Sequence, residues 1–301
     1  MLGVLRTAFS DPVFAAYALR ARLGRGGLLR RYAELARGDG IDRLYFVLSF
    51  DCDTMDDVAV VWGVHSRLLD MGVKPVYAVP GELLIKGEKT YRRILESGGE
   101  FINHGYTEHT YFDVDRGEHA SCFFYDRLPA DVVSEDIRNG DRCLREFLGH
   151  PVQGFRAPHF GTFQKPSQLK FMHAVLAELG YLFSTSTVPL YGLRYGPLVR
   201  KFGLCEIPVS GMADRPLTIL DTWGCFEAPD RVLAPEDYFR QGVAAAGSMA
   251  VGGAGLLNYY ADPSHIHDQE IFFKTVEHWL SVAKPVNYRE FIGCVPCNGK
   301  S

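Results

Sequence analysis

Two aspartates stand directly after the most apolar run of the chain. Asp51 and Asp53 follow residues 44–50 and are separated by one residue. Two carboxylates so close at a strand end allow one to bind a divalent metal while the other takes a proton from a metal-activated water. Asp53 could instead cap the following helix together with Asp56 and Asp57, because acids favour the positive end of the helix dipole. We expect the chemical role for the first pair and the capping role for Asp56 and Asp57.

Two histidines lie in one loop further along the chain. His104 and His109 follow the predicted strand at residues 100–103. One carboxylate and two neutral imidazoles form a common donor set for a catalytic divalent metal that keeps positions open to water. The sequence therefore predicts a metal site of Asp53, His104 and His109. Zinc is the expected ion, and iron, cobalt, nickel and manganese are compatible with the same donors.

An arginine stands at a third strand end. Arg156 follows Gly154 and Phe155, and Pro158 shapes the turn behind it. An arginine in this place can hold a neighbouring carboxylate ionised, which a general base requires. Taken alone, Arg156 would be interpreted as a solvated side chain, so its role depends on the other two clusters.

The residues above must be positioned by alternating strands and helices. From residue 44 onward, short β-rich runs alternate with segments of helical period, which is typical of βα units in a parallel sheet or barrel. The expected strands are residues 44–50, 76–79, 100–103, 154–157, 181–184, 205–209, 217–220 and 256–260, and helices are expected at 91–97, 131–148 and 166–179. Seven or eight strands can close a barrel around side chains, and catalytic groups of such barrels lie at the carboxyl ends of the strands.

An N-terminal arm precedes the barrel. Residues 13–37 have helical apolar stripes interrupted at residues 24–27, which predicts two short helices. Residues 1–38 contain seven arginines but only Asp11 and Glu34 as acids. The arm could make a peripheral contact with a membrane surface, or it could pack on the barrel with its arginines in water, which we favour. The expected domains are a helical extension, residues 1–40, and the barrel, residues 41–301.

Composition narrows the classes of function. The net charge of −4 and the pI near 6.2 argue against a nucleic-acid partner, which needs clustered basic residues. Asp11 and Pro12 come before any apolar signal region develops, and no run is long enough to span a membrane, so we expect a cytoplasmic protein. Seven cysteines favour a reducing compartment. Cys294 and Cys297 have ligand-like spacing, but two ordinary thiols are the simpler interpretation.

Together these motifs resemble those of the NodB-type polysaccharide deacetylases, carbohydrate esterase family 4 (CE4), over roughly residues 44–265. Residues 49–53, Ser-Phe-Asp-Cys-Asp, resemble the first family motif, and residues 155–158, Phe-Arg-Ala-Pro, resemble the third. The resemblance implies that Asp51 is the catalytic base, that Asp53 is a metal ligand, that Arg156 orients the base and that a backbone N–H near His159 helps form an oxyanion hole. It also implies an α/β fold, a distorted (β/α)7 barrel.

The chain departs from the family pattern at two places. The family histidines are usually four residues apart, whereas here Glu108 has that position and His109 comes one later; we favour His109 as the ligand. The last family motif carries a histidine as general acid, and Asp262 stands in its register. Asp262 could act as the acid or orient another residue, His265 could reach in from the loop, or part of the catalysis could be lost. A histidine titrates near pH 6.5, which makes His265 the better acid if it reaches.

The fourth family motif, an Asp and a Trp, is not recognisable after Tyr181, and Trp223 is the candidate substitute. From the resemblance we expect a metal-dependent deacetylase that acts on a small-molecule, nucleotide-linked or lipid-linked amino sugar, a precursor of a surface polysaccharide. A membrane-attached substrate would place the protein at the inner face of the membrane. The alternatives are a deformylase or other small-amide hydrolase, including one for an allantoin-like compound, and a catalytically impaired glycan-binding module.

Overall fold

The structure, a computed structural model, describes residues 12–227 and 233–295. Two predictions involve residues outside these ranges and stay predictions: the absence of a signal region before Asp11, and the interpretation of Cys294 and Cys297 as two ordinary thiols, since Cys297 is not described. Among the described residues, no helix is both long enough and apolar enough to cross a membrane.

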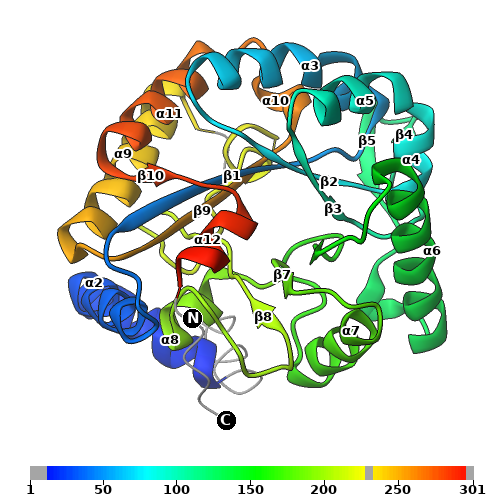
Figure 1. Ribbon diagram of the computed structural model, residues 1–301. Coiled ribbons are helices and arrows are strands. Elements are labelled where there is room, and N and C mark those ends of the chain that lie inside the picture. The colour runs from blue at the N-terminus through cyan, green and yellow to red at the C-terminus, as the bar shows by residue number, and fades with distance from the viewer. Residues whose placement is uncertain (1–11, 228–232, 296–301) are drawn as a thin grey trace.

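A curled parallel sheet forms the centre of the molecule (Figure 1). Its strands follow the order β10-β1-β2-β3-β6-β7-β8. The strand β9 is not part of this path and pairs with β1 over residues 44–50 of that strand. Their bounds are β1 Leu44–Asp51, β2 Val76–Val79, β3 Glu100–Asn103, β6 Gly154–Phe155, β7 Phe183–Ser184, β8 Cys205–Glu206, β9 Gly255–Ala261 and β10 Lys284–Pro285. The edge strands β8 and β9 do not pair with each other. Ser210, in the segment after β8, donates its backbone N–H to the carbonyl of Asn258 (2.8 Å) and so closes this gap. The result is a distorted (β/α) barrel.

Helices cover the outside of the barrel (Figure 1). They are α3 Met55–Asp70, α4 Gly81–Lys86, α5 Glu88–Glu96, α6 Ala130–Leu148, α7 Pro166–Glu178, α8 Pro189–Tyr195, α9 Pro235–Gly252 and α11 Glu270–Val282. Shorter elements lie between them: η1 Tyr125–Arg127, the π-helix η2 Trp223–Glu227 and α10 Pro263–Ile266. The last helix, α12 Tyr288–Cys294, packs its buried Tyr288 and Phe291 against the inner face of the sheet.

The two faces of the strand β1 pack against different parts of the molecule. All of its residues are buried, as expected for a strand covered on both sides. Phe46, Leu48 and Phe50 pack into the large core beneath the helices, whereas Tyr45 and Val47 belong to the interior core. Because side chains alternate along a strand, Ser49 and Asp51 continue the interior face. The interior is therefore apolar at one end and polar at the end where the strands finish.

The start of α3 confirms one capping prediction. The Thr54 hydroxyl accepts the backbone N–H of Asp57, and the Asp57 carboxylate accepts the backbone N–H of Thr54 (3.0 Å), which is a capping box. The same carboxylate also accepts the N–H of Asp53 (3.1 Å). Asp57 therefore fixes the chain just beyond β1, where Asp53 lies.

The N-terminal arm is one kinked helix, α2 Pro12–Gly38. The predicted interruption at residues 24–27 is confined to Gly24, whose φ of −170° and ψ of 66° are not helical. The helix packs against α8 and α9, and the Tyr32 hydroxyl donates to the carbonyl of Leu256 in β9 (3.0 Å). The arm thus lies on the outside of the barrel, as the favoured interpretation expects.

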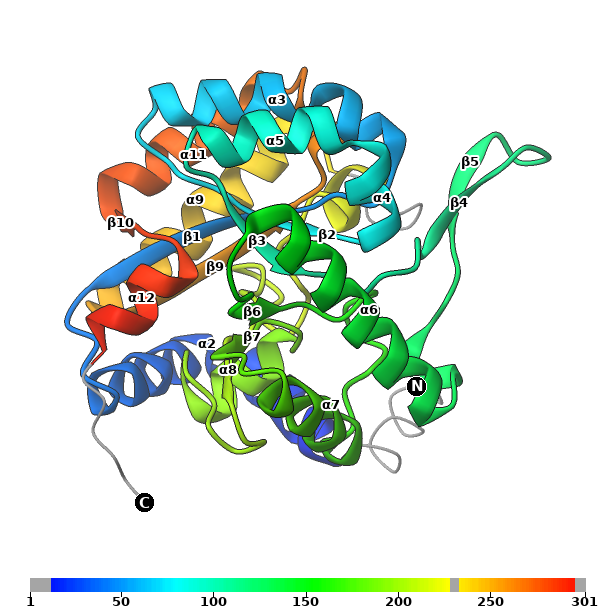
Figure 2. The same ribbon diagram turned by 45° about the vertical axis from the view of Figure 1, so that its right-hand side comes forward.

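Two predictions about strands were wrong or incomplete. Residues 217–220 form no strand: the N–H of Met212 bonds to the Thr218 carbonyl (2.9 Å) and the N–H of Leu220 to Ser210 (3.0 Å), so this segment folds back on its own loop. The irregular stretch after β3 contains an antiparallel hairpin, β4 Thr110–Asp113 and β5 Glu118–Ser121. Figure 2 shows this hairpin, called the arm hairpin below, projecting from the body of the molecule.

Candidate active site

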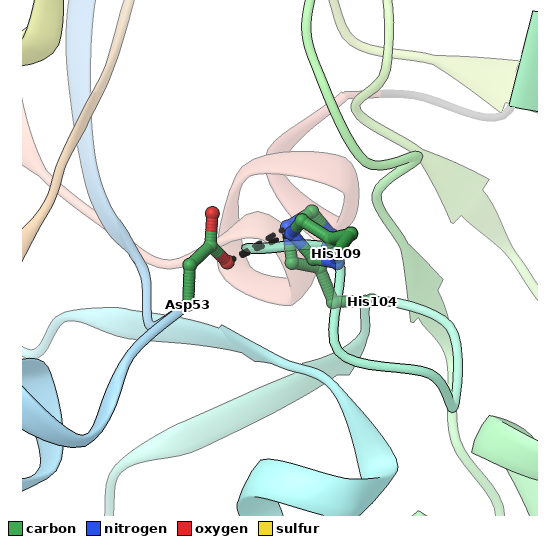
Figure 3. Close-up of side chains that lie close together, drawn as sticks. All are labelled: Asp53, His104 and His109. Atoms are coloured by element: carbon green, nitrogen blue, oxygen red, sulfur yellow. Dashed lines mark ion pairs between the residues drawn. The ribbon is translucent and has the colours of Figure 1, made fainter. Parts of the chain in front are cut away.

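Three predicted residues meet at the ends of the strands (Figure 3). Asp53 follows β1, His104 follows β3 and His109 immediately precedes β4. The Asp53 Oδ1 atom lies 3.0 Å from His109 Nε2 and 3.5 Å from His104 Nε2. The possible ligand atoms of the three residues all lie within 4.8 Å of one another. The structure therefore brings the predicted donor set together.

The donor atoms of this cluster fit a divalent metal ion. Asp53 Oδ1 and His109 Nε2 are buried and have no hydrogen-bond partner among the described residues, which is costly unless a further group binds them. His104 Nδ1 lies 2.8 Å from the Arg156 carbonyl, an arrangement that leaves Nε2 to face Asp53. Burial opposes ionisation of Asp53, but His109 and His104 outweigh it and hold the pKa of this carboxyl well below its usual range. One carboxylate with two imidazoles beside it is the donor composition of a catalytic metal centre.

The loop between the two histidines absorbs the additional residue. Gly105 has a φ of +82°, and a Cβ there would lie 2.4 Å from Asp136 Oδ2, so only glycine fits. The Asp136 carboxylate, on α6, accepts the backbone N–H of Thr107 (2.8 Å) and so fixes the loop. The alternative ligand Glu108 forms an ion pair with Lys86 (2.6 Å) instead. The geometry thus favours His109 over Glu108.

Arg156 and Asp51 form a buried ion pair next to the metal cluster. The guanidinium of Arg156 is fully buried and contacts the Asp51 carboxylate through Nη1. Burial lowers the pKa of Arg156, but the Asp51 carboxylate outweighs this and the net shift is upward, so the arginine stays charged. Asp51 Oδ2 lies 4.0 Å from His104 Nε2. Asp51 is therefore a carboxylate with a permanent cationic partner, immediately beside the three ligand candidates.

Asp262 and His265 form a second acid and base pair. Asp262 Oδ2 lies 3.2 Å from His265 Nδ1 and accepts the Thr222 hydroxyl (3.1 Å). Burial raises the pKa of Asp262 to about 6. The backbone N–H of Ser264, in the first turn of α10, donates to Asp57 Oδ1 (2.9 Å), which ties this pair to the start of α3. His265 thus reaches Asp262, and the pair lies near the capping residue of the Asp53 loop.

No protein-family model and no curated protein sequence matches the chain. Solved structures match its fold at low sequence identity. A protein from Mycobacterium smegmatis, provisionally described as a polysaccharide deacetylase, has a TM-score of 0.61 at 18% identity over 84% of this chain and 90% of that chain. The Puue allantoinase has a TM-score of 0.59 at 11% identity over 84% and 90%. A mutant of a CE4 family pseudoenzyme from Bacillus anthracis, with restored enzymatic activity, has a TM-score of 0.50 at 13% identity over 82% and 66%.

The chain has the NodB-type fold of CE4 proteins. The distorted (β/α)7 barrel that the sequence resemblance implied is thereby confirmed. At these identities the likeness establishes the fold alone, so the roles of the site residues rest on their geometry in this chain.

Within this NodB-type fold, Arg156 depends on residues that the sequence analysis did not assign. Its Nη2 atom donates to Tyr288 Oη (2.8 Å) and to Ser49 Oγ (2.8 Å). The Tyr288 hydroxyl in turn donates to Asn258 Oδ1 (2.8 Å), and Asn258 Nδ2 donates to Thr185 Oγ1 (3.1 Å). An asparagine inside the apolar strand β9 is a signal that could have been used. Tyr288 gave none, because only the folded chain places the first turn of α12 inside the barrel.

His159 links the turn after β6 to the arm hairpin. Its backbone has a φ of +58°, which is strained for a residue with a side chain. The ring donates from Nε2 to the Cys122 carbonyl (2.6 Å), stacks on Phe124 at 4.4 Å and meets the His109 ring edge to face at 5.0 Å. Burial, with His109 beside it, lowers the pKa of His159 to about 4. The side chain thus braces His109, while the predicted oxyanion role of the backbone N–H stays a prediction.

Two aromatic side chains lie beside the ion pair of Asp51 and Arg156. Tyr260 and Phe160 stack at 4.6 Å, and the Arg156 guanidinium lies 5.5 Å and 5.3 Å from their ring centres. The Tyr260 hydroxyl donates to Asp221 (2.8 Å), the start of the Asp-Thr-Trp run that ends at Trp223. Trp223 is 50% exposed. The candidate substitute for the fourth family motif therefore lies one residue from the Thr222 hydroxyl that binds Asp262.

Proposed function

We propose that the protein is a metal-dependent amide hydrolase that removes the N-acetyl group of an amino sugar. The observation that supports this most directly is the cluster of Asp53, His104 and His109, with buried donor atoms that lack partners, next to the buried pair of Asp51 and Arg156. The cluster of three offers a metal centre, and the buried pair offers a general base in a fixed position. The two are what hydrolysis of an unactivated amide requires.

In the proposed mechanism, Asp53, His104 and His109 would hold the divalent metal ion. A divalent ion bound there would polarise the acyl carbonyl and lower the pKa of a water molecule. Asp51 accepts the proton of the attacking water, and the ion pair with Arg156 holds this carboxylate in position. The backbone N–H at His159 is the proposed donor to the developing oxyanion.

The leaving amine requires a proton, which we assign to the pair of Asp262 and His265. A carboxyl whose pKa is about 6 is partly protonated near neutral pH, so the pair can carry a proton to the amine. The chain thus provides an acid at this place without the histidine of the family motif.

The proposed substrate is a sugar precursor of a surface polysaccharide. The partly buried Phe160, on which the buried Tyr260 packs, and the half-exposed Trp223 offer flat apolar rings that suit the apolar face of a pyranose ring. The choice of a nucleotide-linked or lipid-linked precursor rests on the expected cytoplasmic location, and it is likewise a proposal.

Two other functions have specific support. The allantoinase among the solved structures of this fold favours a test of small cyclic amides and formamides. Asp262 in place of the family histidine, and the CE4 family pseudoenzyme among the matches, favour a test for a glycan-binding protein without turnover.

The deciding experiment combines metal content with acetate release. Purified protein is analysed for bound metals, and acetate release is followed from N-acetylglucosamine and from its nucleotide-linked form, with N-formyl sugars and allantoin as competing substrates. Asp53→Ala and His109→Ala should both lose the metal and the activity. Asp56→Ala is the matched control, because this neighbouring acid is 73% exposed and lies outside the cluster. Metal binding without turnover of any substrate would instead support the glycan-binding protein.

A further inference from the structure

The kinked helix α2 has two faces of opposite character. The inner face packs against the barrel through Tyr17, Leu28 and Tyr32, which are buried. The outer face is exposed around the kink, where Leu19 is 58% and Leu23 is 80% exposed. Leucines four residues apart lie on the same side of a helix. They form one apolar spot that no other described residue covers.

Arginines are frequent in the helix that carries this apolar spot, and Arg20 and Arg22 flank the two leucines in the sequence. The arginines of α2 are Arg20, Arg22, Arg25, Arg30, Arg31 and Arg37, and Glu34 is its only acid, whereas the whole chain has a net charge of −4. Among the described residues, Arg20, Arg22 and Arg30 have no ion-pair partner. The surface is therefore locally positive on a molecule that is negative overall, which favours an anionic partner at this one place.

An open hollow extends the positive surface from α2 to α9. Its volume is about 600 Å³, and Arg25, Arg30 and Arg240 lie around it together with Leu29 and Val251. Val251 is 90% exposed. Arg240 pairs with Asp237 (2.7 Å), and Asp214 is an acid that also lines the hollow. Even so, basic and apolar side chains line the hollow between α2 and α9 together.

We propose that this α2 face, made of Leu19, Leu23, Arg20, Arg22 and the hollow beside Arg30, is a docking surface for an anionic lipid bilayer. A nucleic acid would use the arginines but would leave the leucines in water. A bilayer satisfies both kinds of residue, because basic side chains bind anionic headgroups while leucines enter the boundary of the acyl chains. Gly24 allows the exposed half of α2 to adapt to a flat surface, since it already breaks the helix.

The docking surface is connected to the candidate active site by one short stretch of chain. Ala213 lines the hollow, and the same segment continues to Thr222, which binds Asp262. The docking surface and the segment that carries Trp223 thus share one stretch of chain. The proposal does not depend on hydrolase activity, because binding can be measured without any substrate.

Vesicle flotation of the full chain tests the proposal. The protein is mixed with vesicles of equimolar phosphatidylcholine and phosphatidylglycerol, or of phosphatidylcholine alone, at low and at high salt. We expect binding to the anionic vesicles only, weakened by salt because exposed charges are screened. Each basic residue near such a surface contributes about fivefold, so Arg20→Gln with Arg22→Gln should lower the partition coefficient about twenty-five-fold. Leu19→Ser with Leu23→Ser should also lower it.

Matched variants separate docking from general effects. Leu182→Ser removes a leucine that is 51% exposed elsewhere on the surface, and it should bind vesicles like the wild type. Circular dichroism and acetate release from a soluble sugar should be unchanged in all variants. Equal binding to neutral vesicles, no binding to anionic vesicles, or full competition by inorganic phosphate would each overturn the proposal, the last because it would indicate a site for a free anion.

Discussion

At the scale of single residues, the buried cation Arg156 organises the candidate active site. The guanidinium of Arg156 donates to Asp51, Ser49, Tyr288 and the Thr185 carbonyl, and these four hydrogen bonds fix its position. A buried ion pair is costly unless such hydrogen bonds accompany it. The residues that complete this shell are therefore expected to affect the proposed reaction although they do not touch the metal cluster.

The first prediction concerns the hydroxyl of Tyr288. Tyr288→Phe removes the acceptor of Arg156 Nη2 and leaves a buried donor unsatisfied, which costs about 1–3 kcal/mol of stability. We expect kcat to fall at least tenfold, because the orientation of Asp51 loosens, while metal content and KM stay unchanged. Steady-state kinetics with elemental analysis measure this.

The control for this prediction is Tyr259→Phe. Tyr259 is equally buried and its hydroxyl bonds to that of Tyr238 (2.7 Å), on the outer face of β9 and away from Arg156. It should lose a similar amount of stability without the loss of kcat. Equal losses of activity in the two variants would show that Tyr288 acts through stability alone.

The second prediction concerns the proton for the leaving amine. A general acid works in its protonated form, so kcat/KM should fall as pH rises above about 6, the pKa of Asp262. In Asp262→Asn this part of the pH profile should disappear and the rate below pH 6 should drop at least tenfold. The measurement is kcat/KM between pH 5 and 9 with constant metal. An unchanged profile in Asp262→Asn would assign the acid to another residue.

At the scale of elements, His159 joins three parts of the chain: the turn after β6, the loop that carries His109 and the base of the arm hairpin. The arm hairpin is tied to the metal cluster at both of its ends. The Thr110 hydroxyl donates to the Asp53 carbonyl (2.6 Å), and the N–H of Cys122 donates to the His109 carbonyl (2.8 Å). The hairpin is thus anchored at the cluster, although it projects away from it.

The third prediction follows from this junction. His159→Ala removes the ring that packs on His109 and the hydrogen bond to Cys122, so metal affinity should fall about tenfold to a hundredfold, as for other residues that support ligands. Competition with a chelator measures it. His119→Ala, on the exposed side of the same hairpin, should keep wild-type affinity. Wild-type affinity in His159→Ala would mean that the ligand loop holds its shape without this ring.

The sequence was most informative where elements are long and apolar. The strands β1, β2 and β3 were predicted within one residue, because continuous burial leaves an uninterrupted apolar run. The strands β6, β7 and β8 are only two residues long, which is too short for such a pattern. The ranges predicted for them were therefore too long. Residues 217–220 have a composition typical of a strand but no strand edge to pair with. Whether an edge is available depends on the whole fold and cannot be read from this segment.

The candidate site was predictable for a related reason. Asp51, Asp53, His104 and Arg156 lie directly at the ends of predicted parallel strands, and those ends must meet in space. Tyr288 and the ring of His159 lie outside this rule, since long-range packing brings them to the site. The pairing of Asp262 with His265 depends on the turn into α10, and the sequence left it open.

At the scale of the whole molecule, buried titratable groups make stability depend on pH. His65 lies between α3 and the sheet with no exposed surface, and burial lowers its pKa to about 4. Ser97 Oγ donates to the Ile94 carbonyl (2.8 Å), so it accepts from His65 Nε2 (2.7 Å), and the Tyr77 hydroxyl then donates to Nδ1 (2.6 Å). These hydrogen bonds are compatible with the neutral ring that burial favours. Burial acts oppositely on Glu100, whose pKa it raises to about 7.

The fourth prediction uses these opposite signs. The unfolded chain protonates His65 near pH 6.5, whereas the folded chain does so only near pH 4, so this residue favours folding fully above pH 6.5 and progressively less as pH falls. Glu100 is protonated in the folded chain up to about pH 7 but ionises near pH 4.5 when unfolded, so its contribution is lost as pH rises through that window. Wild-type stability alone would hide both effects, because they partly cancel. Urea unfolding of His65→Gln and Glu100→Gln at pH 5 and pH 7 separates them.

Relative to the wild type, His65→Gln should gain about 1–2 kcal/mol in free energy of unfolding on going from pH 7 to pH 5, because glutamine cannot take up the proton. Glu100→Gln should change in the opposite direction and be relatively more stable at pH 7. Metal loss at low pH would affect all three proteins alike, so it cancels in the differences. If both variants tracked the wild type at every pH, neither side chain would be shielded from water as the structure places it, and the packing between α3 and the sheet would have to be looser than described.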